Sequence, residues 1–239
     1  MAVTTTLFNT MTDKDKSDAV KKLIEQSSPR QDFFMMVVLA VLMATFGLLS
    51  NSVAVIIGSM LVAPLLYPLL SLALGIVIAD NKLVSRSFFT LVKSSVLGII
   101  AAAVVTWLFS GQTQMISSLI WFGDRTELIS VAVAVIAGTA ASFALVKPKL
   151  SETLPGIAIS VAMIPPLAMI GVALAWFHWD LLANALVVFL INILGVVSSS
   201  VMVFSLMHLH HKRAVVKTAV KNDEKEIKQE EKEAKNGGR

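Results

Sequence analysis

Prolines in the middle of two long apolar runs are the residues of this chain with the clearest chemical meaning. Pro64 and Pro68 interrupt one run, and Pro165 and Pro166 interrupt another. A proline inside a helix has no N–H to donate and clashes with the carbonyl four residues earlier. In hydrocarbon, a freed carbonyl oxygen needs a neighbouring helix, a hydroxyl, water or a ligand. Such oxygens suit a neutral solute or a dehydrated cation.

Polar side chains near these breaks extend the candidate region. We expect it to expose backbone carbonyls, hydroxyls and amides near the middle of the membrane, through Ser59, Pro64, Tyr67, Pro68, Ser160, Pro165, Pro166 and Asn192. Two interpretations stay open for these residues. A proline kink also sets packing geometry, and a buried Asn or Ser also bonds a neighbouring helix.

The residue types needed for catalysis are missing from the apolar runs. The chain has no cysteine, and none of the runs has an Asp, Glu or His at its centre. Proton relays and intramembrane proteases depend on such groups. We therefore expect no enzyme, no metal site and no cofactor.

Long apolar runs must position the candidate region. Hydrophobic residues make up 56% of the chain, charged residues only 15%, and the mean hydropathy is +0.77. A spanning helix needs about 20 apolar residues. Six runs qualify, which predicts an all-α polytopic bundle of six transmembrane helices at Phe33–Leu49, Val53–Ala79, Ser87–Phe109, Leu128–Val146, Leu154–Phe177 and Ala183–Met207.

Charge placement predicts the orientation. With six spans, one side carries the Lys and Arg residues of both tails together with Lys82, Arg86, Lys93, Lys147 and Lys149, and the other carries Arg125 alone. Positive residues favour the cytoplasmic side. We expect a multi-pass plasma-membrane protein with both termini cytoplasmic. Its expected partners are the lipid bilayer and a small solute or ion, and nucleic acid is not indicated.

The two interrupted runs occupy matching places. Each is the middle span of three, and aligning Pro64 with Pro165 also aligns Ser59 with Ser160. Because three is odd, a duplication of three spans places the halves in opposite orientations. This pattern predicts an inverted 3+3 repeat with broken second and fifth helices, an arrangement found in transporters whose sites lie at the breaks.

The sequence predicts three parts of the chain. These are a cytoplasmic segment 1–32, a transmembrane domain 33–207 and a charged cytoplasmic tail 208–239. In the first part, Asp18–Gln26 predicts a short helix. The tail has helix-forming residues with charges at helical spacing but no strong apolar stripe. It is interpreted either as a solvated extension of the sixth helix or as a docking helix for a partner. Small residues such as Gly138 and Ser142 favour close helix packing or a homo-oligomer.

The apolar part resembles a known family. The stretches DFFMMVVLAVLMATFGLLSNSVAVIIGSMLVAPLLYPLL from Asp32, GIVIAD from Gly75, LPGIAISVAMIPPLAMIGVALA from Leu154 and FLINI from Phe189 are similar to the uncharacterised hydrophobic domain family, domain of unknown function 389. The resemblance implies a prokaryotic polytopic membrane protein and supplies no substrate. The leading hypothesis is a channel or transporter. The alternative is a membrane scaffold or sensor that recruits a partner through its C-terminal tail.

Overall fold

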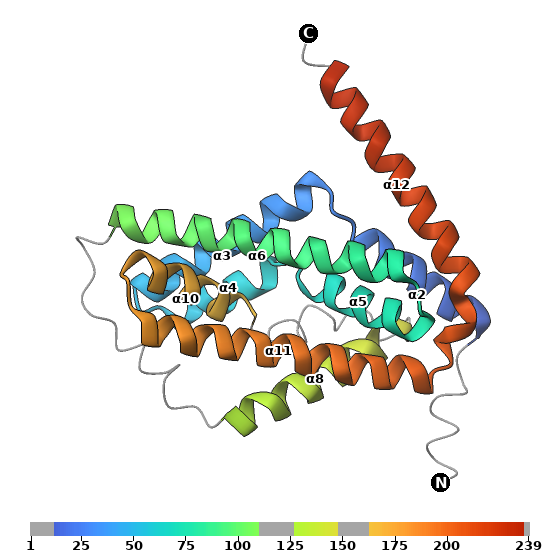
Figure 1. The fold of residues 1–239 in the computed structure, drawn as a ribbon, viewed down its shortest axis with the longest axis horizontal. Coiled ribbons are helices and arrows are strands. Elements are labelled where there is room, and N and C mark those ends of the chain that lie inside the picture. Colours follow the sequence, from blue (N-terminus) through green and yellow to red (C-terminus); the bar gives the residue numbers. More distant parts are fainter. Residues whose placement is uncertain (1–11, 110–126, 148–162, 237–239) are drawn as a thin grey trace.

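The computed structural model describes residues 12–109, 127–147 and 163–236, and in these ranges the chain is helical with no strand. Figure 1 shows the helices packed lengthwise into a bundle, with one helix projecting from its end. In chain order the elements are α2 (Asp13–Gln26), α3 (Gln31–Leu49), α4 (Val53–Val62), α5 (Leu66–Ile78), α6 (Asn81–Phe109), α8 (Glu127–Val146), α10 (Ile164–Ala175), α11 (Trp179–Leu206), the 3₁₀ helix η3 (Leu209–Lys212) and α12 (Arg213–Asn236).

Four helices are long and apolar enough to cross a membrane by themselves: α3, α6, α8 and α11. The pair α4 and α5 makes a fifth crossing if it counts as one span, bent by 49° at its break. The helical, membrane-spanning character predicted from the sequence is thus confirmed. The fifth predicted span, Leu154–Phe177, remains a prediction, because only the part that forms α10 and its C-terminal end lies within the described residues.

The outer surface of the bundle is apolar. Large side chains such as Met35, Phe89, Ile136 and Leu194 are each more than 60% exposed. A soluble protein rarely shows so many exposed apolar residues together. The polar ends of the bundle and this apolar belt are what a chain surrounded by hydrocarbon requires, so the protein is a multi-pass membrane protein.

Three helix ends share one turn geometry. In each, a residue other than glycine takes the left-handed conformation. The φ angle lies between 51° and 55° at Asn51, Ala79 and Phe177. The next N–H then bonds to the carbonyl five residues back, at 2.8 Å for Ser52 to Gly47, 3.0 Å for Asp80 to Gly75 and 3.0 Å for His178 to Ala173. This bond satisfies a carbonyl at the helix end. The turns connect α3 to α4, α5 to α6 and α10 to α11.

The prolines act differently from the sequence expectation. Pro64 lies between α4 and α5, Pro68 is the third residue of α5, and Pro165 and Pro166 are the second and third residues of α10. N–H groups in a first turn have no partner within their helix, so a proline there removes no helical bond. Pro68, Pro165 and Pro166 therefore begin helices, Pro64 lies in the break, and none of the four kinks a continuous helix. At the break, the last turn of α4 supplies carbonyls that have no N–H partner within their own helix.

The left-handed turns give a second way to compare the two interrupted segments. Pro68 precedes the left-handed residue Ala79 by 11 residues, and Pro166 precedes Phe177 by 11 residues. Counted from these turns, Pro68 and Pro166 occupy equal positions, three residues away from the alignment of Pro64 with Pro165.

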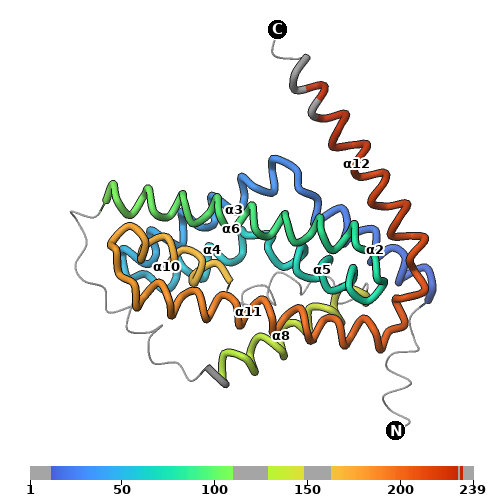
Figure 2. The backbone as a smooth tube through the Cα atoms, in the orientation of Figure 1, coloured from blue at the N-terminus to red at the C-terminus, as the bar shows by residue number. Residues whose placement is uncertain are grey.

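Helices α5 and α10 occupy the inside of the bundle. Nearly every residue of both is buried, whereas α4 buries only Ser59. Figure 2 shows α5 running from the middle of the bundle toward the end that carries α2, and α10 running from the middle toward the opposite end. Each packs on the long helix that follows it, and also on the long helix of the other half: α5 on α11, and α10 on α6.

Glycines allow these helices to approach closely. A Cβ on Gly171 of α10 would collide with the Ala102 side chain and lie 2.7 Å from the carbonyl oxygen of Ile99, both on α6. A Cβ on Gly138 of α8 would likewise collide with α11, and a Cβ on Gly195 of α11 would collide with α8. The small residues that the sequence analysis singled out thus pack helices within one chain.

The C-terminal tail is not the solvated extension of the sixth helix considered above. α11 ends at Leu206, His208 is left-handed, and η3 redirects the chain before α12 begins. Val216, Val220 and Asp223 are buried, and α12 packs on α2. The apolar stripe on α12 is only two turns long. It is therefore too short to dominate the pattern of the whole tail. The predicted N-terminal helix is present as α2 and begins earlier, at Asp13, after a capping box formed by Thr12 and Asp15.

Two glycine substitutions distinguish the effect of close helix packing on stability from the effect of helix propensity. Gly171→Ala adds a methyl group where α10 touches α6, so we expect a loss of about 1–3 kcal/mol and a lower melting temperature in detergent. Gly58→Ala has room, with its nearest neighbour, Met43 Cε, at 3.9 Å. It should be neutral or stabilising, because Ala is favoured over Gly in a helix. Equal melting temperatures for both variants would contradict this packing.

Candidate functional site: the helix break and the charge cluster

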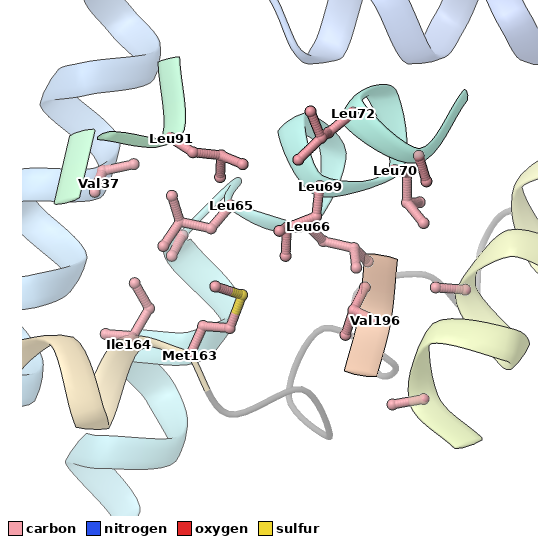
Figure 3. Close-up of a cluster of buried hydrophobic side chains, with 14 of the residues drawn as sticks. Val37, Leu65, Leu66, Leu69, Leu70, Leu72, Leu91, Met163, Ile164 and Val196 are labelled. Atoms are coloured by element: carbon pink, nitrogen blue, oxygen red, sulfur yellow. The ribbon is translucent and has the colours of Figure 1, made fainter. Parts of the chain in front are cut away.

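The break between α4 and α5 is surrounded by apolar side chains. Leu65, which follows Pro64, is buried in the same cluster as Met163 and Ile164 at the start of α10 (Figure 3). Figure 3 also shows Leu66 and Leu69 of α5 approaching Val196 of α11. Among the described residues, the break is therefore filled by leucine, isoleucine and methionine side chains.

The structure brings most of the predicted site residues to the middle of the bundle. Pro64, Tyr67 and Pro68 lie at the α4–α5 break, and Pro165 and Pro166 lie in the first turn of α10. Pro68, Pro165 and Pro166 are buried, whereas Pro64 and Tyr67 are partly buried. Asn192 is buried on α11 and is engaged in an interaction. Ser160 lies outside the described residues.

Hydroxyl groups within the bundle bond mostly to their own helices. Ser59 donates to the carbonyl oxygen of Ile56 at 2.6 Å, and Thr106 donates to that of Ala102 at 2.8 Å. Two bonds connect different helices: Ser87 of α6 donates to Ser71 Oγ of α5 at 3.0 Å, and Ser200 of α11 donates to the Gly138 carbonyl oxygen of α8 at 3.4 Å. The hydroxyl of Ser59 is thus satisfied without a ligand.

Three helix termini meet the middle of the bundle. α4 ends there with its carbonyls, and α5 and α10 begin there. A helix start carries a partial positive charge and a helix end a partial negative one. Prolines at the second or third position reduce the number of N–H groups that the two starts leave unpaired. The arrangement can offer a few backbone donors and acceptors to a solute while otherwise remaining apolar.

A second polar feature lies at the end of the bundle, where α12 meets α2 and α6. Asp223 of α12 is buried and forms ion pairs with Arg86 of α6 and, at 3.4 Å, with Arg30 before α3. Ser28 donates a further hydrogen bond to it at 3.0 Å. A buried carboxylate needs such partners, because an isolated charge away from water is costly. These contacts attach α12 to the membrane domain, and we call Asp223, Arg86, Arg30 and Ser28 the charge cluster.

Arg30 extends the charge cluster along α12. It pairs with Glu226 at 2.7 Å and with Glu230 at 3.2 Å as well as with Asp223. Burial by itself lowers the pKa of Arg30, but the hydrogen bond to Glu226 and the charges of Glu230 and Asp223 raise it overall. The guanidinium therefore stays charged and connects two turns of α12.

The sequence analysis did not find the charge cluster. Its members lie far apart in the chain, and Lys and Arg near spans were interpreted only as orientation signals. One signal was available: Asp223, Glu226 and Glu230 recur at three- and four-residue spacing and so share one face of a helix. In residues 12–109, 127–147 and 163–236, no group of three His, Asp or Glu side chains is arranged to hold a metal ion.

Comparison with known proteins identifies relatives without a known activity. Residues 60–198 match the family model described as a domain of unknown function, DUF389. An uncharacterised protein of Methanocaldococcus jannaschii is 32% identical over 173 residues, which is 72% of this chain and 52% of the archaeal protein. The chain thus spans about half the length of that relative. No solved structure matches.

Neutralising the buried carboxylate should loosen α12. Asp223→Asn leaves the charges of Arg86 and Arg30 without this partner, and the expected cost is about 3 kcal/mol. We expect faster tryptic cleavage at Lys217 and Lys221, followed by mass spectrometry. Glu233→Gln, an exposed site on the same helix, serves as the control and should leave the rate unchanged.

A double-mutant cycle tests whether the charges act together. In the Asp223→Asn/Arg86→Gln variant, the second change should cost less than it does in the parent, because its partner is already neutral. Strictly additive effects would show that the two residues do not act as a pair.

Proposed function

Taking as premise that the chain belongs to the DUF389 family of membrane proteins, we propose that it is a transporter- or channel-like protein whose solute or ion passes the helix break in the middle of the bundle. The observation that carries the proposal is the placement of α5 and α10. Both begin inside the bundle, both are buried, and they run from its middle in opposite directions (Figure 2). Half-length helices that begin at mid-membrane are a common feature of transporter sites.

An inverted 3+3 repeat forms part of the proposal. The α5–α6 and α10–α11 connections have the same turn, and Pro68 and Pro166 stand at equal distances from it. In Figure 1, α6 runs away from the end of the bundle that carries α2, and α11 runs back toward it. Opposite directions of matching helices are what a duplication of three spans requires. With α10 as the second half of a fifth, broken span, the chain would have six.

The proposed pathway is closed at the break in this conformation. Leu65, Met163 and Ile164 are each less than 5% exposed and stand where the three helix termini converge. Carbonyls of the α4 end and the remaining N–H groups of α5 and α10 would contact the solute once these side chains move apart. No acidic residue lies beyond the first two residues of a described spanning helix, which favours a neutral solute or an ion bound by backbone groups.

The second candidate is a membrane scaffold or sensor. It is favoured by α12, which is an ordered helix held to the membrane domain by the charge cluster and extends beyond it (Figure 1). A helix held in this way presents its far end, beyond Glu230, to a partner. We propose no catalytic step for either function.

Flux through proteoliposomes tests the transport proposal. Leu65→Ala removes bulk at the closed break, so we expect a higher rate for whichever ion or small neutral solute the parent passes in a screen. Leu97→Ala is the matched control, because it shortens a leucine to alanine on the exposed side of α6, away from the break. Both proteins must reconstitute to the same density.

Two outcomes would reject this assignment. If neither the parent nor Leu65→Ala exceeds empty vesicles for any solute tested, the protein does not transport them and the scaffold candidate gains support. If Leu65→Ala and Leu97→Ala change the flux equally, the pathway does not pass the break.

The inverted repeat is tested by accessibility labelling. The natural chain has no cysteine, so single cysteines report without background. Val53, Asn81 and Trp179 are exposed and are the first residues of α4, α6 and α11. A membrane-impermeant maleimide should label Val53→Cys and Trp179→Cys from outside the cell, and Asn81→Cys only after lysis. Labelling of Val53→Cys and Trp179→Cys from opposite sides would contradict the six-span inverted arrangement.

A further inference from the structure

A groove of about 580 Å³ lies between the α5–α6 turn and the first half of α12. Four basic residues line it, together with Asp80 and Glu224. We call it the basic groove, and its cations are Lys82, Arg213, Lys217 and Lys221. Because Arg213, Lys217 and Lys221 are spaced by four residues, they follow one another along one side of α12.

The two acids of the basic groove are already engaged. Asp80 Oδ1 accepts hydrogen bonds from the backbone N–H groups of Lys82 at 3.1 Å and Leu83 at 3.0 Å, and so caps the start of α6. Glu224 pairs with the Lys82 ammonium at 2.7 Å. The four cations therefore exceed the two acids, and the excess charge lies on α12.

The lysines on α12 remain available to a ligand. Lys217 and Lys221 are exposed and form no ion pair within the described part of the chain, whereas Arg213 donates to the Ala79 carbonyl oxygen at 3.4 Å. Two ammonium groups one helical turn apart beside a guanidinium are suited to a group with several anionic oxygens, such as a phosphate.

The depth of the basic groove indicates where that phosphate comes from. On α6, Phe88 and Phe89 are more than half exposed, and on α5 Ile76 is 47% exposed, which marks the edge of the apolar belt. Lys82 precedes Phe88 by six residues, or about 9 Å along a helix. The headgroup layer on each side of the hydrocarbon is roughly 5–8 Å thick. The groove therefore lies at the level of lipid headgroups, directly beside exposed apolar side chains.

We propose that the basic groove binds the phosphate of an anionic phospholipid whose acyl chains lie against α5 and α6. Basic pockets at the ends of membrane helices are known to bind such headgroups. The bound lipid would connect α12 to the α5–α6 turn and would add to the attachment made by the charge cluster. The inference does not depend on whether the protein transports a solute.

Native mass spectrometry of the full-length protein in detergent tests the proposal. Phosphatidylglycerol and phosphatidylcholine with identical acyl chains are titrated separately. We expect the parent to retain phosphatidylglycerol more strongly. Lys217→Gln/Lys221→Gln should weaken phosphatidylglycerol binding by about thirtyfold, because each lysine near a membrane surface contributes on the order of 1 kcal/mol.

Matched variants separate this site from general charge. Lys228→Gln/Lys232→Gln makes the same charge change at exposed positions of α12 outside the groove and should leave binding unchanged. Lys217→Arg/Lys221→Arg should also retain it. Equal losses in both Gln pairs, or no loss in either, would overturn the proposal.

A competition arm distinguishes a lipid from a free anion. Inorganic phosphate in molar excess should not displace phosphatidylglycerol, because it makes no contact with the apolar belt. Complete displacement by inorganic phosphate would show a site for soluble phosphate and would reject the lipid.

Discussion

Every helix leaves backbone groups without a partner at its two ends, and this constraint governs the whole structure. At three helix ends the chain meets it with a left-handed residue that lets the next N–H bond back to the helix just completed, around Asn51, Ala79 and Phe177. A non-glycine residue in that conformation costs about 1–2 kcal/mol. The bond offsets part of this cost because it gives a carbonyl oxygen at the helix end a partner.

At the middle of the bundle the same constraint is met by proline. A helix that begins in an apolar interior presents N–H groups without partners, and a proline in the first turn removes one of them. Pro68 serves α5 in this way, and Pro165 and Pro166 serve α10. Half-length helices can therefore begin beside one another in a buried position. The prolines are therefore explained by their structural role at the helix starts. The end of α4 remains the main source of backbone acceptors at the proposed pathway.

Electrostatics becomes important only where the bundle reaches water. The acidic side of α12 contacts Arg30 and Arg86, whereas Lys217 and Lys221 line the groove on its other flank. A helix whose charges are separated in this way is held in one orientation by its own membrane domain. The orientation places the lysines beside the apolar belt, where an anionic headgroup would complete the attachment. The proposed pathway lies between helices whose ends are connected by these contacts.

Sequence periodicity and composition determined that the chain is a helical membrane protein, because about 20 apolar residues in a row have few alternatives. They also located the break at Pro64, because a proline disfavours an uninterrupted helix. Only the tertiary structure decided that Pro68, Pro165 and Pro166 lie in the first turns of helices, that Pro68 and Pro166 stand at equal distances from a left-handed turn, and that Asp223 attaches the tail to the bundle. Those facts depend on left-handed turns at ordinary residues and on contacts between residues almost 200 positions apart, for which local residue patterns carry no information.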